Sequence, residues 1–151
     1  VGMAIGNKLK NYKNKVYCVV GDGEMNEGSN WEAILFAAHH KLDNLVTIID
    51  RNQLQSIYST EDTLALEPFI DKWKSFGWEV SEVDGHNHEE IFKACNNIKA
   101  PRNKPLCIIA NTIKGKGVNF MESNSDWHHG ILNEKLYKKK ILRISKKNSF
   151  F

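Results

Sequence analysis

The stretch VYCVVGDGEMNEGSNWEAILFAAHHKLDNLVTIIDRN, residues 16–52, alternates the patterns of a strand, a helix and a strand. Residues 16–20 are a short apolar run rich in β-branched side chains, and residues 45–49 are a second such run. Between them, apolar side chains recur at helical spacing over residues 29–41, which predicts an amphipathic helix. Parallel strands need a connection of this length. The stretch therefore predicts one strand–helix–strand unit of a parallel sheet.

The same alternation continues along the rest of the chain. Continuous apolar strands are typical of a sheet that is buried on both faces. We therefore expect an α/β fold, a parallel sheet with helices on both faces. The other expected features are a cap at Ser29 or Asn30, a helix from Pro68 that ends at Gly77, a strand at 78–83, a helix at 89–99, a strand at 106–110 and a last amphipathic helix at 133–144.

Composition places the chain among globular proteins of one domain, since 41% of its 151 residues are apolar and 26% are charged. No apolar run approaches the roughly 20 residues that cross a bilayer. The start, VGMAIGNKLK, has neither a basic leader nor a cleavage site, so we expect no signal peptide. Cys18, Cys95 and Cys107 are widely spaced in apolar settings, which predicts buried, reduced thiols in a cytoplasmic protein.

The positive charge of the chain is concentrated at one end. The formal net charge is +3, but seven basic residues and no acidic one follow Glu134. The residues before this segment carry 14 basic and 18 acidic side chains, a net charge of −4. A protein that binds nucleic acid is expected to be basic on its folded body. We therefore interpret the end as a solvated basic tail and expect no nucleic-acid partner.

Polar residues follow the two strands of the first unit. Asp22 comes directly after the first strand, and Asn52 follows the second strand thirty residues later. If the two strands are neighbours, a carboxylate and an amide oxygen converge, and such hard oxygen ligands suit Mg²⁺ or Ca²⁺. Gly21 and Gly23 would let a phosphate approach the backbone at the start of a helix. These features predict a metal-bridged diphosphate.

A plainer reading of the same residues is a chain turn at Asp22-Gly23 and a loop cap at Asn52. The glycines at 21, 23 and 28 do not have the G-x-G-x-x-G spacing of dinucleotide-binding folds. Lys114-Gly115-Lys116-Gly117 does not form a P-loop motif either. The glycine pattern alone therefore leaves the kind of ligand open.

The longer pattern resembles the transketolase family. Residues 21–55, GDGEMNEGSNWEAILFAAHHKLDNLVTIIDRNQLQ, are similar to its thiamine diphosphate motif, which opens with Gly-Asp-Gly and closes with Asn. The similarity extends through LEPFIDKWKSFGWEVSEVDGH at 66–86, NTIKGKGVNFMES at 111–123 and WHHG at 127–130. It looks most like the N-terminal subunit of transketolases that are split over two polypeptides. It implies a partial thiamine diphosphate-binding domain at 1–137 and a basic tail at 138–151.

The resemblance also implies roles for individual residues. Asp22 and Asn52 would bind Mg²⁺ or Ca²⁺ with their side chains, and Leu54 would add its backbone carbonyl. Gly23 and Glu24 would contact the cofactor diphosphate. Glu27 matches an acidic residue at the subunit interface that couples paired active sites, although an acid in the first turn of a helix is also favoured by the helix dipole.

One histidine of the Trp127-His128-His129-Gly130 stretch matches the histidine that faces the cofactor in the family. Alignment on the tryptophan favours His128 as the catalytic residue, and alignment on His-Gly favours His129; we prefer His128. A histidine there can donate hydrogen bonds and move protons. His86 lies at the ligand edge of the sheet, and the lysines of the 114–117 turn could meet phosphate or belong to a surface loop.

The activity that the resemblance implies is transfer of a two-carbon ketol unit between sugar phosphates, as in the pentose phosphate pathway. The family's activating glutamate lies on a pyrimidine-binding domain, so we expect a C-terminal partner subunit, a homo- or hetero-oligomer such as a dimer, and no activity of this chain alone. The start, VGMAIG, falls inside a family helix, which indicates a fragment. The alternatives are deoxyxylulose-phosphate synthase, a 2-oxo acid dehydrogenase component, or a non-catalytic scaffold.

Overall fold

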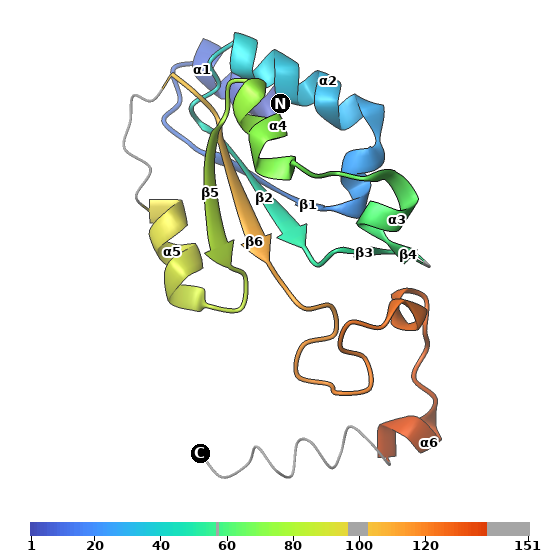
Figure 1. Cartoon of the computed structure of the whole chain (residues 1–151). Coiled ribbons are helices and arrows are strands. Elements are labelled where there is room, and N and C mark those ends of the chain that lie inside the picture. The colour runs from blue at the N-terminus through green and yellow to red at the C-terminus, as the bar shows by residue number, and fades with distance from the viewer. Residues whose placement is uncertain (57, 97–102, 139–151) are drawn as a thin grey trace.

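Four parallel strands form the central sheet of the protein (Figure 1). We describe a computed structural model, in which residues 1–56, 58–96 and 103–138 are described. The strand order is β1-β2-β6-β5, so the strand–helix–strand unit of residues 16–52 joins direct neighbours. The strands are β1 (Val16–Gly21), β2 (Leu45–Arg51), β5 (Glu79–Asp84) and β6 (Leu106–Asn111).

Helices lie on both faces of this sheet, as the sequence predicts. The helices α1 (Gly2–Leu9), α2 (Gly28–His39) and α4 (Phe69–Ser75) pack on one face, and α5 (His88–Asn96) packs on the other (Figure 1). Because side chains alternate along a strand, Leu45 and Ile49 of β2 belong to the larger core, whereas Val46 belongs to the smaller core under α5.

The larger core is rich in tryptophan. Trp73 of α4 and Trp78 lie edge to face, with ring centroids 4.8 Å apart, and both are almost fully buried. The indole Nε1 of Trp78 donates to the carbonyl oxygen of Ile34 in α2, at 2.9 Å. Trp78 therefore contacts both α2 and α4 just before β5 begins.

Short elements surround the carboxyl ends of the strands. The hairpin of β3 and β4 leads into α3, which precedes α4, while η2 and α6 belong to the long segment after β6 (Figure 1). Their bounds are η1 (Gly23–Asn26), β3 (Leu54–Gln55), β4 (Tyr58–Ser59), α3 (Thr60–Leu64), η2 (Ser125–His128) and α6 (Glu134–Leu136).

The structure corrects some of the sequence predictions. The helix α2 begins at Gly28 with Glu27 at its N-cap, so a cap at Ser29 or Asn30 is wrong. Asn30 instead donates its side-chain N–H to the carbonyl oxygen of Glu24, at 2.7 Å. It therefore provides a hydrogen-bond donor for a backbone carbonyl of η1 and does not cap α2. The third strand begins one residue later than predicted, because the backbone N–H of Trp78 donates to the carbonyl oxygen of Trp73 in α4, at 3.2 Å.

Cys18 is exposed, so the prediction of three buried thiols is wrong for this residue. The reason is the position of β1, which has a strand neighbour on only one side in the sheet of the described residues. Cys95 is half-buried and Cys107 is fully buried, and all three cysteines are free thiols. Burial raises the pKa of the Cys107 thiol, which keeps it protonated.

The C-terminal part of the chain lies only partly within the described residues. The predicted helix at 133–144 begins with α6, where the side chain of Asn133 accepts from the backbone N–H of Leu136 at 2.8 Å. Residues 139–144 of that helix and most of the predicted basic tail lie outside the described residues. Within residues 1–56, 58–96 and 103–138, no helix is both long and apolar enough to cross a membrane.

Candidate functional site

The candidate site lies where β1 and β2 end side by side. Gly21 is in register with Asp50, so the residues that follow the two strands emerge at the same edge of the sheet. Asp22 is 1% exposed, and its backbone N–H donates to the carbonyl oxygen of Asp50 at 3.2 Å. Asp22 and Asn52 directly follow β1 and β2, so both residues emerge at this edge of the sheet.

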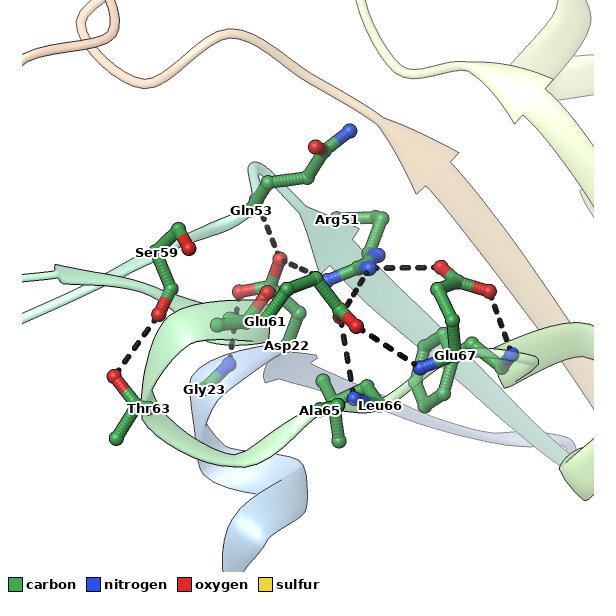
Figure 2. A network of polar contacts seen from close by, with 12 residues as sticks. Asp22, Gly23, Arg51, Gln53, Ser59, Glu61, Thr63, Ala65, Leu66 and Glu67 are labelled. Atoms are coloured by element: carbon green, nitrogen blue, oxygen red, sulfur yellow. Dashed lines mark hydrogen bonds and ion pairs between the residues drawn. The ribbon is translucent and has the colours of Figure 1, made fainter.

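Three donors hold the carboxylate of Asp22. Its Oδ1 accepts from the backbone N–H of Gly23 at 2.8 Å, and its Oδ2 accepts from the backbone N–H of Gln53 at 2.6 Å. Oδ2 also pairs with Nη1 of Arg51 at 3.2 Å (Figure 2). Burial raises the pKa of Asp22, and the hydrogen bonds from Gln53 and Arg51 oppose that rise. The carboxylate thus has a fixed orientation.

Asn52 and Leu54 lie in a tight turn after β2. The side-chain Oδ1 of Asn52 accepts from the backbone N–H of Leu54 at 3.0 Å, and Gln53 between them has a left-handed φ of 63°. The backbone N–H of Thr60 donates to the carbonyl oxygen of Gln53 at 3.0 Å, which closes the β3–β4 hairpin at its base. Leu54 therefore lies inside this closed loop, and Asn52 lies directly before it.

Arg51 is the site residue that sequence reasoning missed. It is 5% exposed, and its Nη1 contacts Thr60 Oγ1 at 2.8 Å in addition to Asp22. Its Nη2 pairs with Glu61 Oε1 at 3.1 Å and with Glu67 Oε1 at 2.8 Å (Figure 2). One guanidinium therefore joins three carboxylates from two parts of the chain. The available signal was an arginine at the end of a buried strand, followed by acidic residues at 61, 62 and 67.

The two glutamates are themselves anchored to the backbone. Glu61 accepts from the N–H of Leu66 at 3.2 Å, and Glu67 accepts from the N–H of Phe69 at 2.8 Å (Figure 2). The hydrogen bond from Phe69 is the main cause that lowers the pKa of Glu67, and Arg51 adds to it. The pKa of Glu61 is also lowered, because its hydrogen bonds and Arg51 outweigh the effect of burial.

The residues of η1 lie directly beside Asp22. A Cβ at Gly23 would come within 2.7 Å of Cβ and Oε1 of Gln55, so the close approach of the two loops requires a glycine there. Glu24 is exposed, and its Oε2 accepts from the backbone N–H of Gly21 at 3.2 Å. Glu27 is exposed at the N-cap of α2 and makes no side-chain capping bond.

His128 and His129 lie on the far segment, at the end of η2, which lies against β3. Both histidines are exposed, and their rings meet edge to face with centroids 4.7 Å apart. Burial, Lys114 and the neighbouring His129 lower the pKa of His128, so its neutral form is favoured. The structure therefore brings the histidine pair to the β3 side of the site and leaves both members accessible.

The loop after β6 is tied to the same edge of the sheet. The backbone N–H of Thr112 donates to the carbonyl oxygen of Arg51 at 3.1 Å, and its hydroxyl bonds Asp50. His86 accepts from the backbone N–H of Ile113 with its Nε2, at 2.7 Å. His86 thus joins the loop after β5 to the loop after β6, whereas Lys116 is exposed on the turn beyond.

The atoms at the edge fit a small divalent cation. Among the described residues, Asp22 Oδ1 accepts one hydrogen bond, from Gly23, and Asn52 Oδ1 accepts one, from Leu54, so each oxygen keeps a lone pair. No cluster of three or more His, Cys, Asp or Glu side chains that could hold a metal is found within the described parts of the chain. A metal here would depend on carboxylate, amide and carbonyl oxygens, which is the chemistry that Mg²⁺ and Ca²⁺ prefer.

Comparison with known proteins agrees with this geometry. Residues 6–150 match the family model described as the thiamine diphosphate binding domain of transketolase. The chain belongs to the transketolase family. The crystal structure of transketolase from Campylobacter jejuni has the same fold, with a TM-score of 0.79 and 34% identity over 89% of this chain and 21% of that chain.

Two curated relatives of this transketolase-family chain are subunits by name. An apulose-4-phosphate transketolase subunit from Phocaeicola vulgatus is 42% identical over 97% of this chain and 52% of its own length. A 6-deoxy-6-sulfo-D-fructose transketolase subunit from a Clostridium species is 40% identical over 99% of this chain and 54% of its own length. The chain thus spans about half the length of these relatives.

Proposed function

We propose that the chain is the thiamine diphosphate-binding part of the N-terminal subunit of a split transketolase, which moves a two-carbon ketol unit between sugar phosphates. The observation that carries the proposal is the register of β1 and β2, which end side by side with Asp22 and Asn52 directly after them. The relatives named above are transketolases, which favours this function over deoxyxylulose-phosphate synthase or a 2-oxo acid dehydrogenase component.

In this proposal, Asp22 and Asn52 bind Mg²⁺, or Ca²⁺, through their side-chain oxygens, and Leu54 adds its backbone carbonyl. Gly23 and Glu24 lie at the start of η1, where backbone N–H groups favour the cofactor diphosphate. When bound, thiamine diphosphate supplies the electron sink for a carbanion that no side chain can stabilise. The contribution of this chain is to bind and orient that cofactor.

His128 is proposed to donate a hydrogen bond to the cofactor or substrate and to move a proton. Its lowered pKa supports this role, because a neutral imidazole can both donate and accept at neutral pH. His129 lies against it and is the alternative residue for the same position. Glu27 is exposed at the start of α2, which leaves its carboxylate accessible to a second subunit.

The proposed partner is a C-terminal transketolase subunit that carries the pyrimidine-binding domain. Two relatives that align with nearly all of this chain are named as subunits, which supports an oligomer of two kinds of chain. Those relatives are named for apulose 4-phosphate and for 6-deoxy-6-sulfo-D-fructose, so we propose a ketose with an anionic end group as the substrate class. A place in the pentose phosphate pathway and a cytoplasmic location stay predictions.

Calorimetric titration tests the proposed binding function. Thiamine diphosphate is titrated with Mg²⁺ into the full chain, alone and with the candidate C-terminal subunit, and Asp22→Ala and Asn52→Ala are run in parallel. Asp71→Ala, an exposed carboxylate on α4, is the matched control. We expect binding that requires Mg²⁺, is lost in both site variants and persists in the control. Absence of binding in both settings, from folded protein, would contradict the proposal.

A further inference from the structure

The two carboxylate oxygens of Asp22 have different surroundings. Oδ2 accepts from two donors, the backbone N–H of Gln53 at 2.6 Å and Nη1 of Arg51 at 3.2 Å. Oδ1 accepts only from the backbone N–H of Gly23, among the residues that the structure describes. A carboxylate oxygen has two lone-pair directions, so Oδ2 is saturated and Oδ1 has one free.

The arginine that saturates Oδ2 is held on its other side. Nη2 pairs with Glu61 and Glu67, and the guanidinium carbon lies 5.4 Å from the ring centroid of Phe69. Both glutamates are fixed by backbone N–H groups of the segment that leads into α4 (Figure 2). Arg51 is 5% exposed and is confined from both ends, so it cannot swing away from Asp22 without breaking several bonds.

We propose that Arg51 is a positioning residue that restricts Asp22 to monodentate metal binding through Oδ1 and thereby favours Mg²⁺ over Ca²⁺. This inference rests on the proposed function. Mg²⁺ requires six oxygens in near-ideal octahedral geometry, to which a carboxylate usually gives one oxygen, whereas Ca²⁺ takes six to eight and readily accepts both. Blocking Oδ2 removes the geometry that would serve Ca²⁺ best.

Substitution of Arg51 therefore changes the relative affinity for the two metals. In Arg51→Gln, the hydrogen bond from Nη1 to Oδ2 is lost. One lone pair of Oδ2 becomes free, which allows Asp22 to bind Ca²⁺ with both oxygens. The loss of a nearby positive charge acts on both divalent cations alike and cancels in the ratio of their dissociation constants. Glu67→Gln leaves the bond from Arg51 to Asp22 in place but removes one anchor, so its effect has the same direction and is smaller.

The experiment measures that ratio directly. Mg²⁺ and Ca²⁺ are titrated separately, in excess thiamine diphosphate, into the full chain, with the partner subunit where the unsubstituted protein requires it. The variants are Arg51→Gln, Glu67→Gln and Arg51→Lys. The lysine keeps the positive charge but lacks the two Nη groups of the guanidinium. Lys74→Gln, which removes an exposed positive charge on α4, is the control. Circular dichroism establishes that each variant is folded.

We expect Arg51→Gln to shift the ratio toward Ca²⁺ by about tenfold, since one added oxygen ligand strengthens a calcium site. Arg51→Lys should shift the ratio of dissociation constants less, and it replaces Arg51→Gln as the test if the glutamine variant does not fold. An equal weakening of both metals, or a ratio no different from that of Lys74→Gln, would overturn the inference while leaving the proposed function intact. Failure of the unsubstituted protein to bind thiamine diphosphate with either metal would contradict the proposed function and the inference with it.

Discussion

The two sides of the candidate site are built in different ways. On one side, Asp22 and Arg51 are 1% and 5% exposed, and one buried ion pair joins them at the end of the sheet. On the other side, His128 and His129 are exposed at the end of the short helix η2. The side that would hold the metal is thus buried, whereas the histidine side is a surface segment that contacts β3.

This difference indicates how the two sides respond to change. Removal of one partner from a buried ion pair leaves a charge that water cannot solvate. Exposed side chains on loops usually contribute little to folding. Substitutions on the Arg51 side should therefore cost stability as well as function, and substitutions of the histidines should affect function alone.

The largest expected effect is the loss of stability in Arg51→Met. This variant keeps the apolar stem against Phe69 but leaves Asp22 buried without its cation, which should cost about 3 kcal/mol of unfolding free energy. His128→Ala should change stability by less than about 0.5 kcal/mol. Urea denaturation of both variants checks the comparison, and equal losses would show that the two sides are not different in kind.

Two glycines in the loop after β6, which precedes the histidines, differ in how closely their surroundings are packed. Gly115 has φ of 76°, and a Cβ there would come within 2.6 Å of the carbonyl oxygen of Met121; Gly117 has φ of 90° with nothing within 4 Å. Gly117→Ala should therefore cost only its backbone strain, about 1 kcal/mol, and Gly115→Ala more. Hydrogen exchange of the 113–123 amides and thermal unfolding measure both, and equal effects would mean that this loop does not keep a fixed turn.

Acid should loosen the Arg51 side in a defined range of pH. The pKa of Glu67 is lowered from its usual value of 4.5, so the folded state favours the charged form. The stabilisation is fully present above that value and is lost as the pH falls through the lower folded pKa. The raised pKa of Asp22 acts in the opposite direction, since protonation of Asp22 on acidification favours the folded state.

Glu67→Gln isolates this contribution. Unfolding free energy measured by urea denaturation between pH 6 and pH 3, about the range in which carboxylates titrate, should fall less steeply in the variant than in the unsubstituted chain. Asp71→Asn, on the exposed side of α4, serves as the control and should keep the original slope. A slope that Glu67→Gln leaves unchanged would mean that the Glu67 carboxylate does not contribute to the pH dependence of stability.

The smallest expected effect belongs to the link between the loops. His86→Ala removes the acceptor for the backbone N–H of Ile113, an exposed hydrogen bond that should contribute about 0.5 kcal/mol or slightly more. The amide of Ile113 should exchange faster with solvent, while amides of α2 keep their rates. His40→Ala, at the end of α2, is the control. Unchanged exchange at Ile113 would exclude His86 as the link.

Much of the fold was predictable because it depends on patterns within short windows. The apolar runs of β1, β2 and β6 and the spacing of apolar residues in α2 identify the elements, and the crossover rule makes the sheet parallel. Since parallel neighbours end at one edge, the placement of Asp22 and Asn52 at that edge followed from the same pattern.

The rest depended on contacts between distant segments. Arg51 was missed because its partners Glu61 and Glu67 belong to a stretch without periodicity, whose path around the arginine no local rule gives. Cys18 was predicted to be buried because its strand is apolar, but only the strand order reveals that β1 lies at an edge. The helix α1 was expected only from the resemblance, because GMAIGNKL combines glycines with few large apolar side chains.

The most direct test of the central claim is to locate the metal. Crystals of the full chain, with its partner subunit where binding requires it, are grown with thiamine diphosphate and Mn²⁺, and the anomalous signal of Mn²⁺ marks the ion. We expect one peak within coordination distance of Asp22 Oδ1 and Asn52 Oδ1, with Arg51 still bound to Oδ2. A peak elsewhere, or a cofactor bound while Asp22 and Asn52 have no metal between them, would contradict the account.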